Sequence, residues 1–171
     1  MGLAPQVASG QGYVDHAALL VDVLGLMAHC QKDALINAKV GTTDGGPGVW
    51  ERVNESMSDR ARMYQEAVTG VPSEIDYRVN GVKFDGFKNG TLIDVKGPGY
   101  EKFLNTERTK TLPWYRGGDL LMNQARAQVR AAGDTPVKWI VTEADFAQYL
   151  SGQFMETGIP IDVVHRPFVR N

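Results

Sequence analysis

Two aspartates and one lysine near the middle of the chain have types and spacings that could do chemistry. Asp85 and Asp94 lie on either side of the pair Asn89-Gly90, and Lys96 follows two residues after Asp94. Asn-Gly between alternating runs predicts a tight hairpin, because both central residues of a type I′ turn need positive φ. A two-residue turn at this pair places residue 85 opposite residue 94, so the two carboxylates would face each other.

Facing carboxylates indicate a cation site, because like charges directly opposite in a sheet destabilise it. Aspartate oxygens with open water positions suit Mg2+ or Mn2+. Lys96 shares a strand face with Asp94, where it could orient or deprotonate an attacking water, or stabilise charge that develops on phosphorus. The chemistry indicated is metal-assisted phosphodiester hydrolysis. The alternative is an ordinary solvated face, since antiparallel sheets often expose one side to water, and register alone does not decide between the two.

The strands that must position these residues follow from a second Asn-Gly pair, Asn80-Gly81. Together the two pairs predict a three-stranded meander with strands at 75–79, 82–88 and 91–96, in which Asp76 also lies across from Asp85. Alternation then places on one face, the core face, Ile75, Tyr77, Val79, Val82, Phe84, Ile93 and Val95. The opposite face carries Asp76, Arg78, Lys83, Asp85, Phe87, Leu92, Asp94 and Lys96.

Helices and further strands are predicted on both sides of this meander. Hydrophobic periodicity and end signals predict helices at about 14–38, 51–68, 119–132 and 145–155, and strands at 137–141 and 161–165. The segment Gly41 to Gly48, with four glycines and a proline, is typical of a linker. We therefore predict an N-terminal helical extension and linker over residues 1–48 and one α/β domain over residues 49–171.

Composition and charge narrow the class of protein. With 171 residues, 43% hydrophobic and 22% charged, the chain can form one globular domain. Its single cysteine excludes an internal disulfide and any zinc site built on paired cysteines. No apolar run approaches the roughly 18 residues that span a bilayer, so we expect no membrane insertion. Although the net charge is −2, residues 83–130 hold nine basic and five acidic side chains, which would favour a polyanion there.

The residues around the candidate site resemble a known nuclease signature. Phe84-Asp85-Gly86-Phe87 followed by Ile93-Asp94-Val95-Lys96-Gly97-Pro98-Gly99-Tyr100 is similar to the PD-(D/E)xK pattern. Over about residues 50–168 the chain resembles the restriction endonuclease fold toxin 5 family of bacterial polymorphic toxins. The further pieces that carry this resemblance are Tyr64-Gln65, Val68 to Pro72, Gln124 to Gln128, Val137-Lys138-Trp139, Ile161-Asp162-Val163 and His165-Arg166-Pro167.

The resemblance implies a restriction-endonuclease-like αβββαβ core with a mixed central sheet, here with an N-terminal helical extension. It implies a metal-dependent endonuclease, with DNA favoured as substrate and Mg2+ or Mn2+ as cofactor. Two alternatives stay open, a ribonuclease toxin and a non-catalytic interaction domain that retains a nuclease fold. The family also implies an antibacterial effector, made in the producer cytoplasm, secreted (often by type VI secretion) and active in the target-cell cytoplasm. Its expected partners are a cognate immunity protein and a secretion chaperone or longer delivery protein.

Site residues can be carried over position by position. The expected catalytic residues are Asp85, Asp94, Lys96, Gln124 and Glu66. Of these, Asp85, Asp94 and Glu66 are the expected metal ligands, with Glu55 as the other acid that could complete the site and Gln65 as the family-like residue. The expected nucleic-acid contacts are Lys83, Tyr100, Lys102, Arg116 and Gln128. Trp114 and Tyr115 offer further stacking faces in the long loop between residues 97 and 118.

Overall fold

The computed structural model describes residues 16–169 and divides the chain into two units, each described here by itself. The first unit ends at Ala34, and its described part belongs to helix α1 (His16–Lys39), which continues into the second unit. This helix confirms the prediction for 14–38, apart from residues 14 and 15, which lie outside the described residues. No helix between residues 16 and 169 has the length and apolar character needed to cross a membrane.

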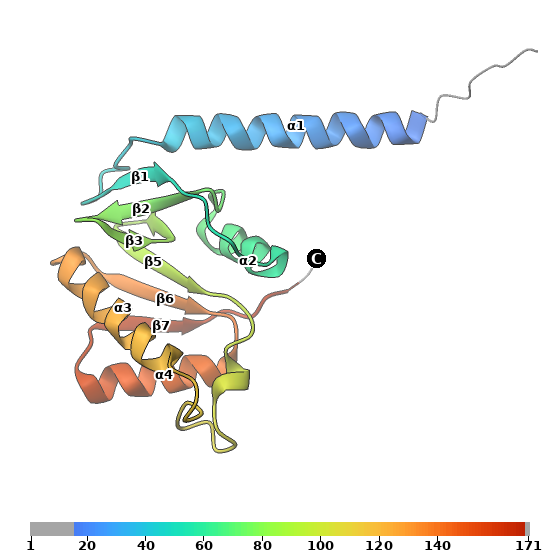
Figure 1. Cartoon of the computed structure of the whole chain (residues 1–171). Helices are drawn as coiled ribbons and strands as arrows, with labels where there is room; N and C mark the ends of the chain where they lie inside the picture. Colours follow the sequence, from blue (N-terminus) through green and yellow to red (C-terminus); the bar gives the residue numbers. More distant parts are fainter. Residues whose placement is uncertain (1–15, 170–171) are drawn as a thin grey trace, which may run out of the picture. The chain divides into compact units, whose positions relative to one another are not determined.

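The second unit, which begins at Leu35, is an α/β structure with two sheets (Figure 1). Strands β1, β2 and β3 form an antiparallel sheet, and β4, β5, β6 and β7 form a mixed sheet in which β5, β6 and β7 run parallel. In chain order after α1 its elements are β1 (Val49–Arg52), α2 (Asp59–Thr69), β2 (Ile75–Val79), β3 (Val82–Phe84), β4 (Gly86–Lys88), β5 (Thr91–Lys96), the 3-10 helix η1 (Glu101–Phe103), α3 (Gly117–Ala132), β6 (Val137–Val141), α4 (Ala144–Thr157) and β7 (Ile161–His165).

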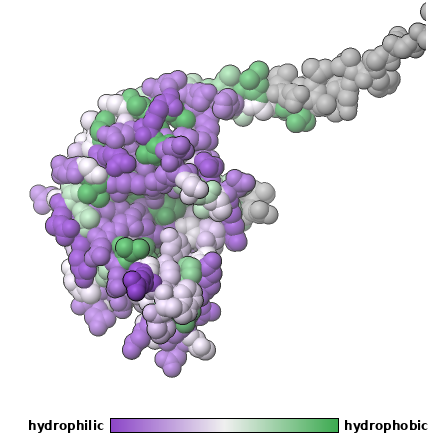
Figure 2. All heavy atoms as spheres, in the orientation of Figure 1, coloured by the Kyte–Doolittle hydropathy of each residue, from purple (hydrophilic) through white to green (hydrophobic). Residues whose placement is uncertain are grey.

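Helices cover both faces of the mixed sheet. Helix α2 packs on one face, where Tyr64 and Val68 contact Ile93 of β5 and Ile140 of β6. Helices α3 and α4 cover the other face and bury the larger core around Trp139 (Figure 1). Burial of these apolar side chains is the main favourable term in folding. Outside, the face seen in Figure 2 is mainly hydrophilic, with small separate hydrophobic patches.

The predicted middle strand, 82–88, is interrupted at Asp85, and this corrects the predicted meander. Asp85 is a bend between β3 and β4, so the strands belong to two different sheets. The interruption also changes which side chains share a face. Leu92, assigned to the polar face, is fully buried in the larger core together with Phe84, whereas Ile93 packs on the opposite side against α2. A one-residue break reverses the alternation, because successive side chains of a strand point to opposite faces.

The start of the predicted helix 51–68 was wrong. Residues 49–52 form strand β1, which pairs with β2 and buries Trp50 at 1% exposure. Helix α2 begins only at Asp59, after Ser58, whose hydroxyl accepts the N–H of Ala61. A serine N-cap satisfies one of the unpaired N–H groups of the first turn. The hydrophobic stripe therefore located the helix correctly, but not its beginning.

The glycine-rich segment 41–48 is a packed turn. Gly48 lies against β2, and a Cβ on it would stand 2.2 Å from the carbonyl oxygen of Arg78. The Tyr77 hydroxyl accepts the N–H of Gly48 at 3.0 Å and donates to the carbonyl of Thr43 at 2.7 Å. Small residues are needed here because the backbone itself touches the sheet. The domain boundary at residue 48 stays a prediction.

Candidate active site

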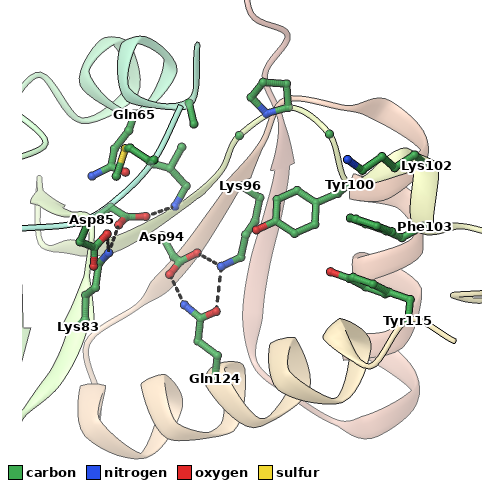
Figure 3. A pocket seen from close by; sticks show the side chains of 17 residues that line it. Gln65, Lys83, Asp85, Asp94, Lys96, Tyr100, Lys102, Phe103, Tyr115 and Gln124 are labelled. Atoms are coloured by element: carbon green, nitrogen blue, oxygen red, sulfur yellow. Dashed lines mark hydrogen bonds and ion pairs between the residues drawn. The ribbon is translucent and has the colours of Figure 1, made fainter. Parts of the chain in front are cut away.

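A cavity of about 580 Å3 opens at the end of β5 and brings most of the predicted site residues together. It is bounded by the strands that carry Lys83, Asp94 and Lys96, by α2 and α3, and by the loop that follows β5 (Figure 3). Its lining residues are Glu55, Met57, Ala61, Gln65, Lys83, Asp85, Asp94, Val95, Lys96, Gly97, Pro98, Gly99, Tyr100, Lys102, Phe103, Tyr115 and Gln124.

Asp94 is held from three directions. Its Oδ1 lies 2.5 Å from the Lys96 ammonium. Its Oδ2 accepts the side-chain amides of Gln124 and Gln128, each at 2.7 Å. The residue is 2% exposed. Buried charges persist when they are paired and hydrogen-bonded, so this network fixes the carboxylate as an acceptor in one orientation.

Gln128 owes its orientation to Trp139. The Trp139 indole N–H, which can only donate, is 2.7 Å from the Gln128 Oε1. The Gln128 amide nitrogen must therefore face Asp94 and the carbonyl of Lys83, at 2.7 and 3.1 Å. Gln128 is fully buried. It was predicted as a nucleic-acid contact, but the structure places it behind Asp94 as a positioning residue, where it does not line the cavity.

Lys96 is buried at 5% exposure, between polar and aromatic partners. Besides Asp94, its ammonium donates to Gln124 Oε1 at 3.0 Å and lies 4.1 Å from the centroid of a Trp139 ring. An ammonium over an indole face is attracted by the ring quadrupole. Trp139 thus contacts both halves of the Asp94–Lys96 pair, directly or through Gln128. No motif pointed to this role, although the register of β5 with β6 sets Trp139 beside Asp94.

Asp85 approaches Asp94 through its bend. Its Oδ2 accepts the N–H of Val95 at 2.6 Å, and its Oδ1 lies 3.4 Å from the Lys83 ammonium. Burial, and then the negative charge of Asp94, raise the pKa of Asp85 to about 7. A carboxyl beside a like charge in a low-dielectric site resists ionisation. The repulsion that the sequence predicts for this pair is therefore present in the folded chain.

Lys83 contacts three carboxylates. Its ammonium pairs with Glu55, and lies 3.5 Å from Asp76 and 3.4 Å from Asp85. Burial lowers the pKa of Lys83, but the three carboxylates raise it further, so the net pKa lies above the usual range. Asp76 has no exposed surface, and burial raises its pKa to about 6 against the opposing effect of Lys83. Predicted as a nucleic-acid contact, Lys83 here neutralises acidic groups at one side of the cavity.

The opposite wall is the loop after β5, and Glu143 holds it in place. The Glu143 carboxylate accepts three backbone N–H groups, from Gly99 at 2.9 Å, Tyr100 at 2.7 Å and Glu101 at 3.0 Å. Glu101 in turn accepts the N–H of Asp145 near the start of α4 at 3.2 Å. Glu143 thus caps the start of η1, and Glu101 caps the start of α4. Each carboxylate accepts backbone N–H groups that have no partner within their own helix.

Two predicted residues lie elsewhere. Glu66 faces away from the cavity, and its Oε1 accepts the N–H and the hydroxyl of Ser73, both at 3.1 Å. Its neighbour Gln65 lines the cavity instead and is 7% exposed. Arg116 is exposed before α3 and does not line the cavity. Neighbouring residues of α2 point in different directions, so the helix contributes Gln65 to the site and not Glu66.

The donor set suits a hard divalent ion that keeps water or substrate oxygens among its ligands. Asp94 Oδ1 is buried and has no hydrogen-bond partner; the Lys96 ammonium is its ion-pair contact. Across residues 16–169, no three or more His, Cys, Asp or Glu side chains gather to hold a metal by themselves. Mg2+ is commonly held by one or two carboxylates plus waters and phosphate oxygens. Asp85 and Asp94 fit that kind of site.

Sequence similarity agrees with this geometry. The family model described as restriction endonuclease fold toxin 5 matches residues 61–144. This range includes all but the first two residues of α2, the Asp85 bend, β5, α3 and Trp139. No curated protein matches the chain. The α/β structure, with an antiparallel three-stranded sheet and a mixed four-stranded sheet, is consistent with a restriction-endonuclease-like fold. Residues 61–144 thus match the restriction endonuclease fold toxin 5 family, and that match implies a nuclease toxin domain.

Proposed function

We propose that this chain is a divalent-metal-dependent endonuclease that hydrolyses phosphodiester bonds in DNA. The observation that carries the proposal is the convergence of Asp85, Asp94 and Lys96 in one cavity of a domain from a nuclease toxin family. Two carboxylates that repel each other, next to a buried lysine, suit a cation and a phosphate better than a structural role.

Asp85 and Asp94 would hold the metal, Mg2+ or Mn2+. When bound, the ion supplies positive charge that polarises the scissile phosphate and favours ionisation of water. Glu66 is left out of this ligand set, because its carboxylate binds Ser73. Gln65, which lines the cavity, is the remaining polar side chain on α2 that can contact a ligand there.

Lys96 and Gln124 act on the reacting groups. In hydrolysis a water oxygen bonds to phosphorus, the bond to the leaving oxygen breaks, and that oxygen takes up a proton. The Lys96 ammonium lines the cavity, where it can orient the water or stabilise charge on the phosphate oxygens. Gln124 bonds Asp94 through its nitrogen and Lys96 through its oxygen, and so fixes their relative placement.

In its biological setting we propose an antibacterial effector. Toxin family membership supports delivery from a producing cell into a target cell, by type VI secretion or a related route, with action in the target cytoplasm. An immunity protein in the producer would protect it from its own toxin. The role of residues 1–48, as a binding site for a chaperone or as a piece of a longer delivery protein, belongs to the same proposal.

The proposal is tested with purified full-length chain on supercoiled plasmid, single-stranded circular DNA and total RNA, with Mg2+, Mn2+ or EDTA. DNA should be cut only with metal. Asp94→Asn should abolish cutting, and Lys96→Met should slow it by about 100- to 1000-fold, the usual loss for one charge-stabilising group. Matched controls are Asp162→Asn and Lys138→Met, because these residues form an exposed ion pair at 3.2 Å on neighbouring strands. Circular dichroism checks folding.

Each of the other possible outcomes would contradict one part of the proposed function. Cutting of RNA but not DNA would replace DNA by RNA as substrate. Cutting in EDTA would refute metal dependence, and no cutting of any nucleic acid would refute the nuclease proposal. In bacteria, expression of the wild-type chain should reduce viability and nucleoid staining, whereas Asp94→Ala should leave both unchanged.

A further inference from the structure

The catalytic groups lie at the bottom of a small cavity, which limits the shape of a substrate. Asp85, Asp94 and Lys96 are only 5%, 2% and 5% exposed. The cavity volume of about 580 Å3 is in the range of small-ligand sites. A DNA duplex is a stiff double strand over this length scale. A phosphate of a single strand, with its sugar and base free to turn, can reach groups at this depth more easily than one fixed in a duplex.

The wall formed by the loop after β5 is aromatic. Phe103 and Tyr115 line the cavity with their rings parallel, 4.0 Å between centroids and 6° between planes. Trp114 meets both edge-on, at 5.9 and 6.4 Å. Figure 3 shows Tyr100, Phe103 and Tyr115 on the side of the cavity opposite Asp85. The Phe103–Tyr115 pair thus braces Trp114, which is 67% exposed.

The Trp114 ring does not line the cavity itself, but it is exposed and meets edge-on two rings that do. Tyr100 is stacked on Phe146 at 4.7 Å. Phe103 has Tyr115 on one side and the Lys102 ammonium 4.9 Å from its centroid. A single exposed aromatic ring is common on protein surfaces, so it is the contact of Trp114 with two cavity-lining rings that points to a binding surface. Nucleobases stack on such rings with little regard to sequence.

The charges around the cavity suit a strand that enters from the side of the aromatic wall. Lys102 lies in the same wall and is exposed, so it can contact a phosphate. The acidic side chains lie across the cavity, with Lys83 among them. The wall is also fixed in place, because Leu112 donates to the Phe103 carbonyl at 2.7 Å and Glu143 holds residues 99–101.

We infer that the substrate is single-stranded or locally unpaired DNA, with a base stacked on Trp114 and a neighbouring phosphate at Asp94 and Lys96. This inference rests on the proposed nuclease function and specifies its substrate. It follows that supercoiled plasmid, which opens locally, is cut faster than the same plasmid relaxed and closed.

Binding is measured without cleavage, with the full-length Asp94→Asn chain and a fluorescent 10-mer, either single-stranded or as a duplex, by fluorescence anisotropy. The single strand should bind at least about 10-fold more tightly. Trp114→Leu in the same background should weaken single-strand binding by about 5- to 100-fold, the range for one base stack, and leave duplex binding unchanged. The matched control is Met155→Leu, because Met155 is 80% exposed on α4.

Equal or tighter duplex binding, an equal effect of Trp114→Leu on both forms, or no binding of either form would overturn the inference. Cleavage assays keep it separate from the proposed function. A wild-type chain that cuts duplex and single strand at equal rates would remain a nuclease and refute the substrate assignment. A chain that binds single strands through Trp114 and cuts nothing would refute the nuclease and leave the binding site standing.

Discussion

The bond between Trp139 and Gln128 gives a double-mutant prediction. Trp139→Phe removes the indole N–H and leaves the buried Gln128 Oε1 without its donor. An unsatisfied buried polar group costs about 1–3 kcal/mol, and the smaller ring adds a packing loss. Gln128→Leu leaves the Trp139 N–H unpaired and takes one donor from Asp94, so it should cost about 2–4 kcal/mol.

In the double variant both unpaired groups disappear. Its loss of unfolding free energy should therefore be smaller than the sum of the single losses by about 1–3 kcal/mol. The assay is urea unfolding of all four proteins in EDTA, with equal m-values required before the energies are compared. Both Gln128→Leu proteins should also cut DNA more slowly, because Asp94 loses one of its two amide donors and keeps only the Gln124 amide and the Lys96 ammonium.

The matched control is Trp50→Phe, which removes an indole N–H bonded to a different residue, Asp44, at 2.9 Å. Its effect should add to that of Gln128→Leu within about 0.5 kcal/mol, as expected for sites that share no partner. If the stability losses of Trp139→Phe and Gln128→Leu also add within about 0.5 kcal/mol, the hydrogen bond does not orient Gln128 and the prediction is refuted.

Three further predictions concern other contacts. Folding raises the pKa of Asp76 to about 6, so the folded state favours the protonated carboxyl. The resulting contribution to the free energy of unfolding is complete at a pH below the unfolded pKa and is lost as the pH rises through 6. Wild-type stability relative to Asp76→Asn should thus fall by up to about 3 kcal/mol between pH 4 and pH 8, by urea unfolding in EDTA. Glu143→Gln should speed hydrogen exchange at residues 99–101, because an amide oxygen replaces a carboxylate that accepts three N–H groups. Gly48→Ala should lower the melting temperature, since its Cβ would stand 2.2 Å from the Arg78 carbonyl oxygen.

Each of these has an outcome that would contradict it. The control for Asp76→Asn is Asp134→Asn, at an exposed carboxylate; an equal pH dependence of stability in both variants would reject the assignment to Asp76. Unchanged exchange in Glu143→Gln would mean that other bonds hold the loop. Gly152→Ala, inside α4 where a Cβ meets nothing within 4 Å, should keep or raise the melting temperature, because alanine favours a helix; equal losses at Gly48 and Gly152 would show that close packing is not the cause.

The sequence by itself determined the local elements of the site. Both Asn-Gly pairs adopt the positive φ angles that the hairpins require, 50° and 79° at Asn80-Gly81 and 50° and 73° at Asn89-Gly90. Strands 75–79, 91–96, 137–141 and 161–165 lie where alternation and end signals predict them. These features follow from short-range steric and periodic rules, so they are readable without the fold. They place Asp85, Asp94 and Lys96 on either side of one turn, whereas Gln124, on α3, joins them in the cavity through packing.

Only the tertiary structure decided the break at Asp85, strand β1 and the role of Trp139. The break depends on a bond between the Asp85 side chain and Val95 N–H, ten residues away, and on helices that cover both faces of β5. Gln128 looks like a surface residue in the sequence, because its three partners lie on strands that are distant along the chain. Local patterns fix where side chains point along one element. Which elements meet, and therefore which polar groups must be satisfied by which partners, is settled only when the core closes.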